Sequence, residues 1–165
     1  MKSHYIYNEY EPYLKNLEYK EKIYIENRLI NQIIWYDESA IKKQNRYKKL
    51  TIASIIMTAL IPFFSLYTSS KYNIFFTSII TILSALSSAL LAIINLSEYQ
   101  KLWIQYRYNC EILKSILYRY LMKTGEFNSD DDDENLEYLI ELSESYLTNE
   151  FKEWRGLKHS IKEEL

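Results

Sequence analysis

Two long runs without a charged side chain are the feature that most constrains the fold of this chain. The first extends from Leu50 to Ser70 and the second from Tyr72 to Ser97, with Lys71 alone between them. As a helix rising about 1.5 Å per residue, each run is long enough to cross about 30 Å of hydrocarbon. Helices buried in a soluble bundle, the alternative, rarely extend this far without a charge. We therefore interpret the runs as two membrane-spanning helices.

The short segment between the runs predicts a helical hairpin. Residues 68–73 are polar and too few for more than an extracytoplasmic turn between spans at 50–67 and 74–97. Five basic residues lie shortly before the first span and three follow the second, whereas the turn offers Lys71 alone. By the positive-inside rule, we expect a multi-pass inner-membrane protein with both termini in the cytoplasm. The first twenty residues have no apolar core, so we expect no signal peptide.

The remaining sequence predicts long helices and hence an all-α protein of one domain. Two glycines and two prolines leave few interruptions in 165 residues. We expect a helix over 12–49, a helix over 98–125 that continues the second span, an acidic loop over 126–134 and a last helix over 135–158 that folds back. These helices would form an antiparallel cytoplasmic bundle.

Apolar residues at helical spacing predict the packing faces of this bundle. After the second span they alternate steps of four and three, which is the pattern of a coiled-coil seam. That seam comprises Tyr99, Trp103, Tyr106, Cys110, Leu113, Leu117 and Tyr120. Before the first span a similar stripe comprises Ile25, Leu29, Ile33, Tyr36 and Ala40. Trp35 precedes the first span in a segment that could meet the one around Trp103, so we expect it to join the seam.

Polar side chains follow one side of the second span. They are Thr77, Thr81, Ser84, Ser88 and Asn95, and we call them the polar stripe. Thr58 adds a hydroxyl from the first span. One interpretation is close helix packing, with the hydroxyls bonded across helices or back to their own helix. The other is a water-lined pathway that forms when several copies assemble, with these residues lining the pore.

Beside the polar stripe runs a face of small residues, Ala85, Ala89 and Ala92, which we call the small face. Small residues let helix backbones approach closely in membranes. A single hairpin cannot cover both faces, so the pattern predicts a homo-oligomer. Pro62 in the first span frees a backbone carbonyl, which permits either a tolerated kink or a gating bend.

A polar cluster is predicted next to the spans on the cytoplasmic side. Asp37 precedes the first span by about as many residues as Arg107 and Glu111 follow the second. We expect Arg107 to form an ion pair with Asp37 or with Glu111 between packed helices.

The composition excludes several classes of function. Twenty Lys and Arg residues against 22 Asp and Glu residues leave no basic field for nucleic acid. One cysteine, two histidines near opposite ends and two glycines provide no metal centre, catalytic triad or phosphate-binding loop. The acidic loop lacks the spacing and central glycine of a calcium loop, so we interpret it as a solvated linker that caps the next helix. We expect no enzyme activity, cofactor or metal.

Two motifs beside the spans resemble a known family. They are Trp35-Tyr36-Asp37 before the first span and Trp103-x-x-Tyr106-Arg107-x-x-x-Glu111 after the second. With the spans, they are similar to the bacterial SLATT superfamily, including its domain-of-unknown-function branch, over roughly residues 25–154. The resemblance implies a two-span bacterial membrane effector that opens a pore in anti-phage defence. Because no nucleotide-sensing domain is fused here, it also implies a trigger from a separate cytosolic sensor or nucleotide-signal protein.

Two hypotheses follow for the function. The first is an oligomeric pore, similar to an ion channel, that is gated through its cytoplasmic helical bundle. The second is a membrane anchor or scaffold that conducts nothing and docks a cytosolic signalling partner. Both hypotheses name the lipid bilayer as a partner, and the first also requires further copies of the chain.

Overall fold

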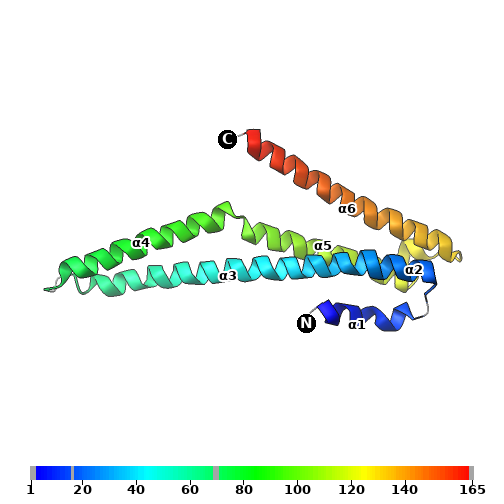
Figure 1. The fold of residues 1–165 in the computed structure, drawn as a ribbon, viewed down its shortest axis with the longest axis horizontal. Helices are drawn as coiled ribbons and strands as arrows, with labels where there is room; N and C mark the ends of the chain where they lie inside the picture. Colours follow the sequence, from blue (N-terminus) through cyan, green and yellow to red (C-terminus); the bar gives the residue numbers. More distant parts are fainter. Residues whose placement is uncertain (1–2, 16, 69–70, 164–165) are drawn as a thin grey trace. The chain divides into compact units, whose positions relative to one another are not determined.

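A computed structural model describes the backbone of residues 3–15, 17–68 and 71–163 and the side chains of residues 6–15, 17–68 and 71–148. Within these ranges every regular element is helical, so the all-α class predicted from the sequence is confirmed (Figure 1). The chain divides into two compact units. The terminal unit comprises residues 1–36 and 108–165, and the hairpin unit comprises residues 37–107.

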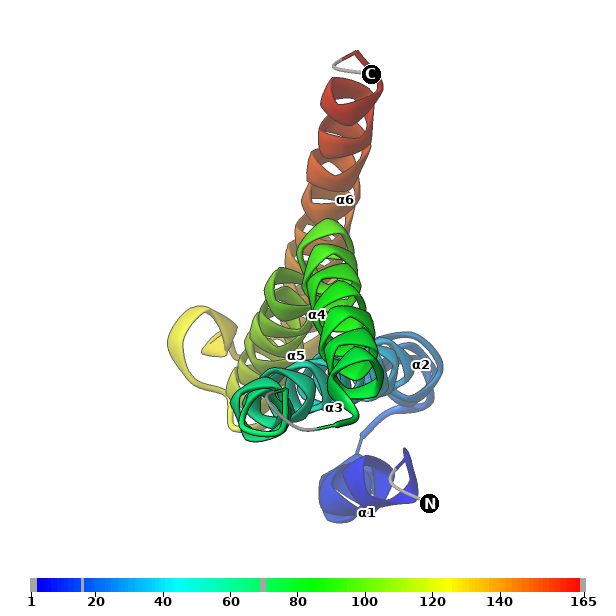
Figure 2. The same ribbon diagram turned by 90° about the vertical axis from the view of Figure 1, so that its left-hand side faces the viewer.

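The hairpin unit is built from two long antiparallel helices. Helix α3, Asn31–Ser65, supplies most of its length to this unit, and α4, Asn73–Leu96, returns beside it. Figure 2, viewed from the end that holds the connecting turn, shows the two helices side by side. Pro62 lies in the last turn of α3, and its missing N–H leaves the carbonyl of Thr58 in the preceding turn without its helical hydrogen bond. Residues 69 and 70 of the predicted turn lie outside the described residues.

The second helix of the hairpin ends before α5, Tyr99–Leu121, begins. Glu98 adopts a left-handed backbone conformation with φ of 44°, and its carbonyl accepts a hydrogen bond from Leu102 N–H at 3.0 Å. The sequence predicted one continuous helix through this position. The structure instead has a two-residue break that neither glycine nor proline marks, and a non-glycine residue in this conformation costs about 1 kcal/mol.

The terminal unit contains the other helices. They are α1, Ser3–Leu14; α2, Tyr19–Tyr24; the π-helical η1, Ile25–Ile30; the short 3-10 helix η2, Gly125–Phe127; and α6, Asp132–Glu163. The first residues of α3 and most of α5 complete the unit. Its core holds the apolar side chains predicted to pack, since Ile25, Leu29, Ile33 and Tyr36 are buried together with Leu113 and Leu117. The Cys110 thiol is also fully buried and donates to the carbonyl of Ile33 at 3.7 Å.

The N-terminal segment differs from the single helix expected over 12–49. Helix α1 ends at Leu14, and α2 begins at Tyr19. The carboxylate of Glu21 accepts a hydrogen bond from Glu18 N–H at 2.7 Å, which satisfies an otherwise free donor at the start of α2. Pro12, where the predicted helix over 12–49 begins, instead lies near the end of α1.

The acidic segment leads directly into the last helix. Asp131 accepts a hydrogen bond from Asp133 N–H at 2.9 Å, and α6 starts at Asp132, three residues before the predicted start at 135. Three acidic residues in its first turn interact favourably with the positive end of the helix dipole. On the other side of the segment, α5 ends at Leu121, four residues before Gly125.

Candidate functional site

Three hydroxyl groups form the polar centre of the hairpin unit. Ser87 of α4 lies 3.2 Å from the hydroxyl of Ser54 and 2.8 Å from that of Thr58, both on α3. Ser54 and Ser87 are 3% and 5% exposed. Thr58 also donates to the carbonyl of Ser54 at 2.9 Å. Hydrogen bonds within the cluster therefore satisfy the buried Ser54 and Ser87, whereas Thr58 is exposed.

Sequence reasoning placed Thr58 among pore-lining candidates and did not single out Ser87. Ser87 lies between Ser84 and Ser88 of the polar stripe, next to Ser88 in the sequence, but it does not belong to the pattern. Its role depends on which α3 residue lies opposite, and that register is fixed by helix packing rather than by periodicity within α4. A pair of hydroxyls at i and i+4 in α3, here Ser54 and Thr58, was the available signal.

Most of the polar stripe is not covered by the hairpin itself. Ser84 is half-buried, whereas the other four members, Thr77, Thr81, Ser88 and Asn95, are exposed. Thr81 donates to the carbonyl of Thr77 at 2.9 Å, and the neighbouring Ser78 donates to that of Ile74 at 2.8 Å. These residues line a shallow open groove along the first half of α4.

The small face lies outside the α3–α4 contact as well. Ala85, Ala89 and Ala92 are all exposed. Pro62 is exposed too, and its carbonyl accepts the Ser65 hydroxyl at 2.7 Å. The buried side of α4 is instead marked by Ser87 and Ile94, so the two patterned faces remain available to other molecules.

Large apolar side chains cover the outside of the hairpin unit. Ile55, Phe63, Ile74 and Ile82 are each more than half exposed. Among the residues that the structure describes, two helical stretches are long and apolar enough to cross a membrane, and their most apolar segments are only 6% and 11% buried. A core helix of a soluble bundle would be mostly buried, so this exposure favours a bilayer around the hairpin.

One end of the hairpin unit carries an ion pair between its helices. Arg107 Nη1 lies 2.8 Å from Asp37 Oδ1, and the Asp37 side chain is 14% exposed. Asp37, one of the two carboxylates considered from the sequence, thus accepts a hydrogen bond from Arg107. Glu111 belongs to the terminal unit, where it lies 4.0 Å from Lys114.

The predicted seam residues of α5 differ in burial along the helix. Leu113 and Leu117 are fully buried in the terminal unit, whereas Tyr99, Trp103 and Tyr106 in the hairpin unit are half-buried. Trp35, expected on the same seam, is half-exposed, and its ring meets the edge of Tyr36 at 5.0 Å between centroids.

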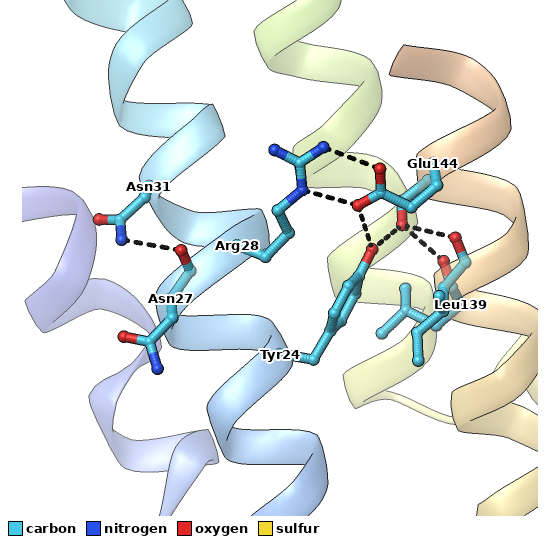
Figure 3. A network of polar contacts seen from close by, with 8 residues as sticks. Tyr24, Asn27, Arg28, Asn31, Leu139 and Glu144 are labelled. Atoms are coloured by element: carbon cyan, nitrogen blue, oxygen red, sulfur yellow. Dashed lines mark hydrogen bonds and ion pairs between the residues drawn. The ribbon is translucent and has the colours of Figure 1, made fainter. Parts of the chain in front are cut away.

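A polar network joins α2, η1 and α6 within the terminal unit (Figure 3). Arg28 donates to both carboxylate oxygens of Glu144 at 2.7 and 2.8 Å. The Tyr24 hydroxyl lies 2.6 Å from that of Ser143 and donates to Glu144 at 3.3 Å. The hydrogen bonds from Arg28 lower the pKa of Glu144, whereas burial raises the pKa of Tyr24. The network fixes α6 against the N-terminal helices, as the bundle prediction requires.

Two tyrosines of α5 hold the N-terminal helices in the same way. Tyr118 donates to Glu9 of α1, and this hydrogen bond raises the pKa of Tyr118 to about 12. Tyr120 donates to the buried carboxylate of Glu21 on α2, and burial is the main cause of its raised pKa. A cavity of about 310 Å³ opens beside Tyr120 and Glu21.

The acidic side chains of the described part of the chain lie apart from one another or pair with nearby groups. There, no three His, Cys, Asp or Glu side chains converge into a group that could hold an ion. Asp132 of the acidic segment instead pairs with Lys123 at 2.6 Å. Glu134 accepts the Ser129 hydroxyl at the same distance.

Comparison with known proteins yields one match. A family model described as "Protein of unknown function (DUF4231)" covers residues 31–135, which include both apolar helices and the polar cluster around Arg107. No curated protein and no solved structure matches the chain.

Proposed function

Because the chain belongs to the DUF4231 family, whose description states no activity, we propose a function from its geometry. We propose that it is an oligomeric membrane protein whose hairpin units form an ion-conducting pore and whose terminal unit controls opening. The hairpin crosses the inner membrane of a bacterium, and both termini lie in the cytoplasm. The proposal involves no catalytic step and no cofactor.

The exposed polar stripe of α4 is the observation that carries this proposal. Thr77, Thr81, Ser88 and Asn95 are exposed on a helix whose other exposed residues are mostly large and apolar. A hydroxyl can return its hydrogen bond to its own helix, as Thr81 does. The carboxamide of Asn95 has two donors and an acceptor, which lipid tails cannot satisfy. Water in a shared lumen, or a neighbouring copy, would satisfy them.

The small face supports assembly of several copies. The exposed Ala85, Ala89 and Ala92 lie next to the polar stripe on α4. A helix from a second hairpin can approach closely there, and this contact turns the polar stripe of each copy towards a common axis. Without charged groups inside the spans, such a pore would discriminate among ions weakly, through its diameter and its hydroxyl dipoles.

The hydrogen-bond networks of the terminal unit support its proposed role in control. Networks such as Arg28–Glu144 tie its helices together, so a partner that binds this unit could shift the equilibrium between two arrangements. The SLATT resemblance suggests the nature of that partner, a separate cytosolic sensor or nucleotide-signal protein in a bacterial defence system. This part of the proposal rests on analogy with that superfamily.

Release of dyes from liposomes tests the pore. We expect the full chain to release ions and small dyes, and Ser84→Leu with Ser88→Leu to abolish release while the oligomer persists. Leu86→Ile with Leu91→Ile is the matched control, because it changes two exposed residues of α4 without changing their polarity. Equal release from both double variants, or a monomeric chain that neither leaks nor depolarises cells, would contradict the proposal.

A second candidate function is a non-conducting anchor that docks a cytosolic signalling partner. The exposed aromatic residues of the terminal unit favour it, since Trp35 is 50% and Tyr108 64% exposed. Aromatic side chains are enriched in protein interfaces. In this case substitutions in the polar stripe would be silent, and Trp35→Ala or Tyr108→Ala would abolish function in cells.

A further inference from the structure

The end of the hairpin unit that carries the Arg107–Asp37 pair is strongly basic. Residues 37–49 contain five basic and two acidic side chains, and residues 97–107 contain two basic and one acidic. Together these segments carry a net charge of +4 in a chain whose total charge is −2. The basic character is therefore concentrated where the apolar helices begin and end.

Three of these cations are already neutralised by nearby carboxylates. Lys42 lies 3.7 Å from Glu38, Lys101 lies 3.7 Å from Glu98, and Arg107 lies 2.8 Å from Asp37. Lys43 and Arg46 differ from them. Among the residues that the structure describes, no carboxylate lies within 4.0 Å of either side chain.

Lys43 and Arg46 instead converge on one aromatic side chain. The Lys43 ammonium lies 5.5 Å from the centroid of the Tyr99 ring. Hydrogen bonds from Ser97 and Arg46, aided by the charges of Arg46 and Lys43, lower the pKa of the Tyr99 hydroxyl. Two cations and a hydroxyl thus lie together beside the break at Glu98, where the environment favours negative charge.

Arg46 lies at the depth of a lipid headgroup, and Lys43 lies just beyond it, from where its long flexible side chain can reach back. At about 1.5 Å per residue, Arg46 lies about 6 Å and Lys43 about 10 Å before the start of the apolar run at Leu50. The polar headgroup layer of a bilayer is about 5–8 Å thick on each side. Exposed apolar side chains follow immediately, with Leu96 88% and Ile93 47% exposed. A bound molecule would thus meet cations at one end and apolar surface at the other.

We propose that Lys43, Arg46 and Tyr99 form a binding site for the phosphate of an anionic phospholipid. The two cations contact the phosphate oxygens, the Tyr99 hydroxyl donates a hydrogen bond to the headgroup, and the acyl chains lie along Ile93 and Leu96. The commitment to a lipid rests on charge complementarity and on continuity with the exposed apolar surface. Binding here requires no conduction, so the inference does not depend on the pore.

Titration of the detergent-solubilised full chain with dioctanoyl phosphatidylglycerol, read by native mass spectrometry, tests the site. We expect Lys43→Gln with Arg46→Gln to weaken binding about tenfold or more, since each basic residue near an anionic surface contributes about 1 kcal/mol, or roughly fivefold. Lys42→Gln with Lys101→Gln is the matched control. It removes the same charge from cations already paired to Glu38 and Glu98, so we expect less than about a threefold change.

One further variant and two further ligands distinguish a specific lipid site from a diffuse positive field or a site for free phosphate. Lys43→Arg with Arg46→Lys keeps both charges, so it should retain most of the affinity even if the glutamine variant is unstable. Equal weakening by the glutamine variant and its control would overturn the proposal, because a diffuse field would explain it. Equal binding of dioctanoyl phosphatidylcholine would also overturn it. Competition by soluble glycerol phosphate at concentrations as low as those of the lipid would assign the site to free phosphate instead.

Discussion

The two units of this chain place their apolar side chains in opposite ways. Of the buried apolar residues in the described part of the chain, all but Ala40 and Ile94 belong to the terminal unit. The hairpin unit instead exposes residues such as Ile55, Ile74 and Ile82. Hydrophobic burial can hold the terminal unit together in water. The hairpin helices bury little, so they must rely on a surrounding apolar phase, close packing and a few hydrogen bonds.

The largest expected difference between the units comes from the same truncation made in each. Leu117 is fully buried in the terminal unit, whereas Leu86 is 47% exposed on α4. We expect Leu117→Ala to lower the free energy of unfolding by about 2–5 kcal/mol, because a cavity remains. Leu86→Ala should lower the free energy of unfolding by much less, because the side chain is already partly exposed. Thermal unfolding followed by circular dichroism in detergent measures both, and equal losses would contradict the assignment of two environments.

The second largest difference between the units should come from a charge introduced at an exposed position, because only the hairpin unit is expected to lie in the membrane. Leu86→Arg in the middle of α4 should raise the free energy of membrane insertion by about 3 kcal/mol. Tyr108→Arg, at a position 64% exposed in the terminal unit, should leave insertion unchanged. A glycosylation-based insertion assay reports the ratio of inserted to non-inserted helix. Normal insertion of the Leu86→Arg chain would argue that α4 does not face lipid.

The hydroxyl cluster of the hairpin should contribute a smaller amount. Ser87→Ala removes the group that bonds Ser54 and Thr58 of α3. Side-chain hydrogen bonds between membrane helices average about 0.6 kcal/mol and reach about 1.7 kcal/mol, so we expect a loss in that range. The matched control is Ser88→Ala, one residue away and exposed. Unfolding in mixed micelles should distinguish the variants, and a larger effect from Ser88→Ala would place the helix contact elsewhere.

The smallest expected effect is a pH dependence confined to the terminal unit. Arg28 lowers the pKa of Glu144, so this carboxylate stabilises the fold above its ordinary pKa of about 4.3, and the stabilisation is lost as the pH falls through the lower folded value. Because the side chains of Arg28 and Glu144 are 48% and 36% exposed, solvent screening limits the effect to less than about 1 kcal/mol.

Melting temperatures between pH 5 and pH 3 measure this contribution. Glu144→Gln should lower the stability at pH 5 and flatten the decline towards pH 3. Glu137→Gln, at an exposed position of α6, is the control and should leave the profile unchanged. An unaltered profile in the Glu144→Gln chain would show that the pair contributes nothing measurable.

The sequence predicted the parts of the fold that depend on composition and period. Two uncharged runs were sufficient to predict the apolar helices. The spacing of Ile25, Leu29 and Ile33 was sufficient to predict that these three side chains are buried. The break at Glu98 could not be predicted, because neither glycine nor proline occupies it and periodicity continues across it. The start of α2 was also missed, since the glutamates that cap it were hidden in a charged segment.

The candidate sites, too, were predictable only where local sequence determines them. Proximity in sequence to the spans was enough to consider Asp37 as a partner of Arg107. Long-range partners such as Tyr24 with Ser143 and Tyr120 with Glu21 depend on how α2, α5 and α6 pack, which no pattern within one helix encodes. Ser87 illustrates the limit most clearly, because a rotation of α4 by one residue would have exchanged it with Ser88.

The buried thiol of Cys110 makes it possible to measure how often the helices of the terminal unit separate. It is the only cysteine of the chain, and its side chain is enclosed beside Ile33. A thiol reagent can therefore react with the wild-type protein only when α5 and the N-terminal helices separate. The rate of labelling therefore reports how often the helices separate, without any engineered probe. A partner that activates the protein should change this rate.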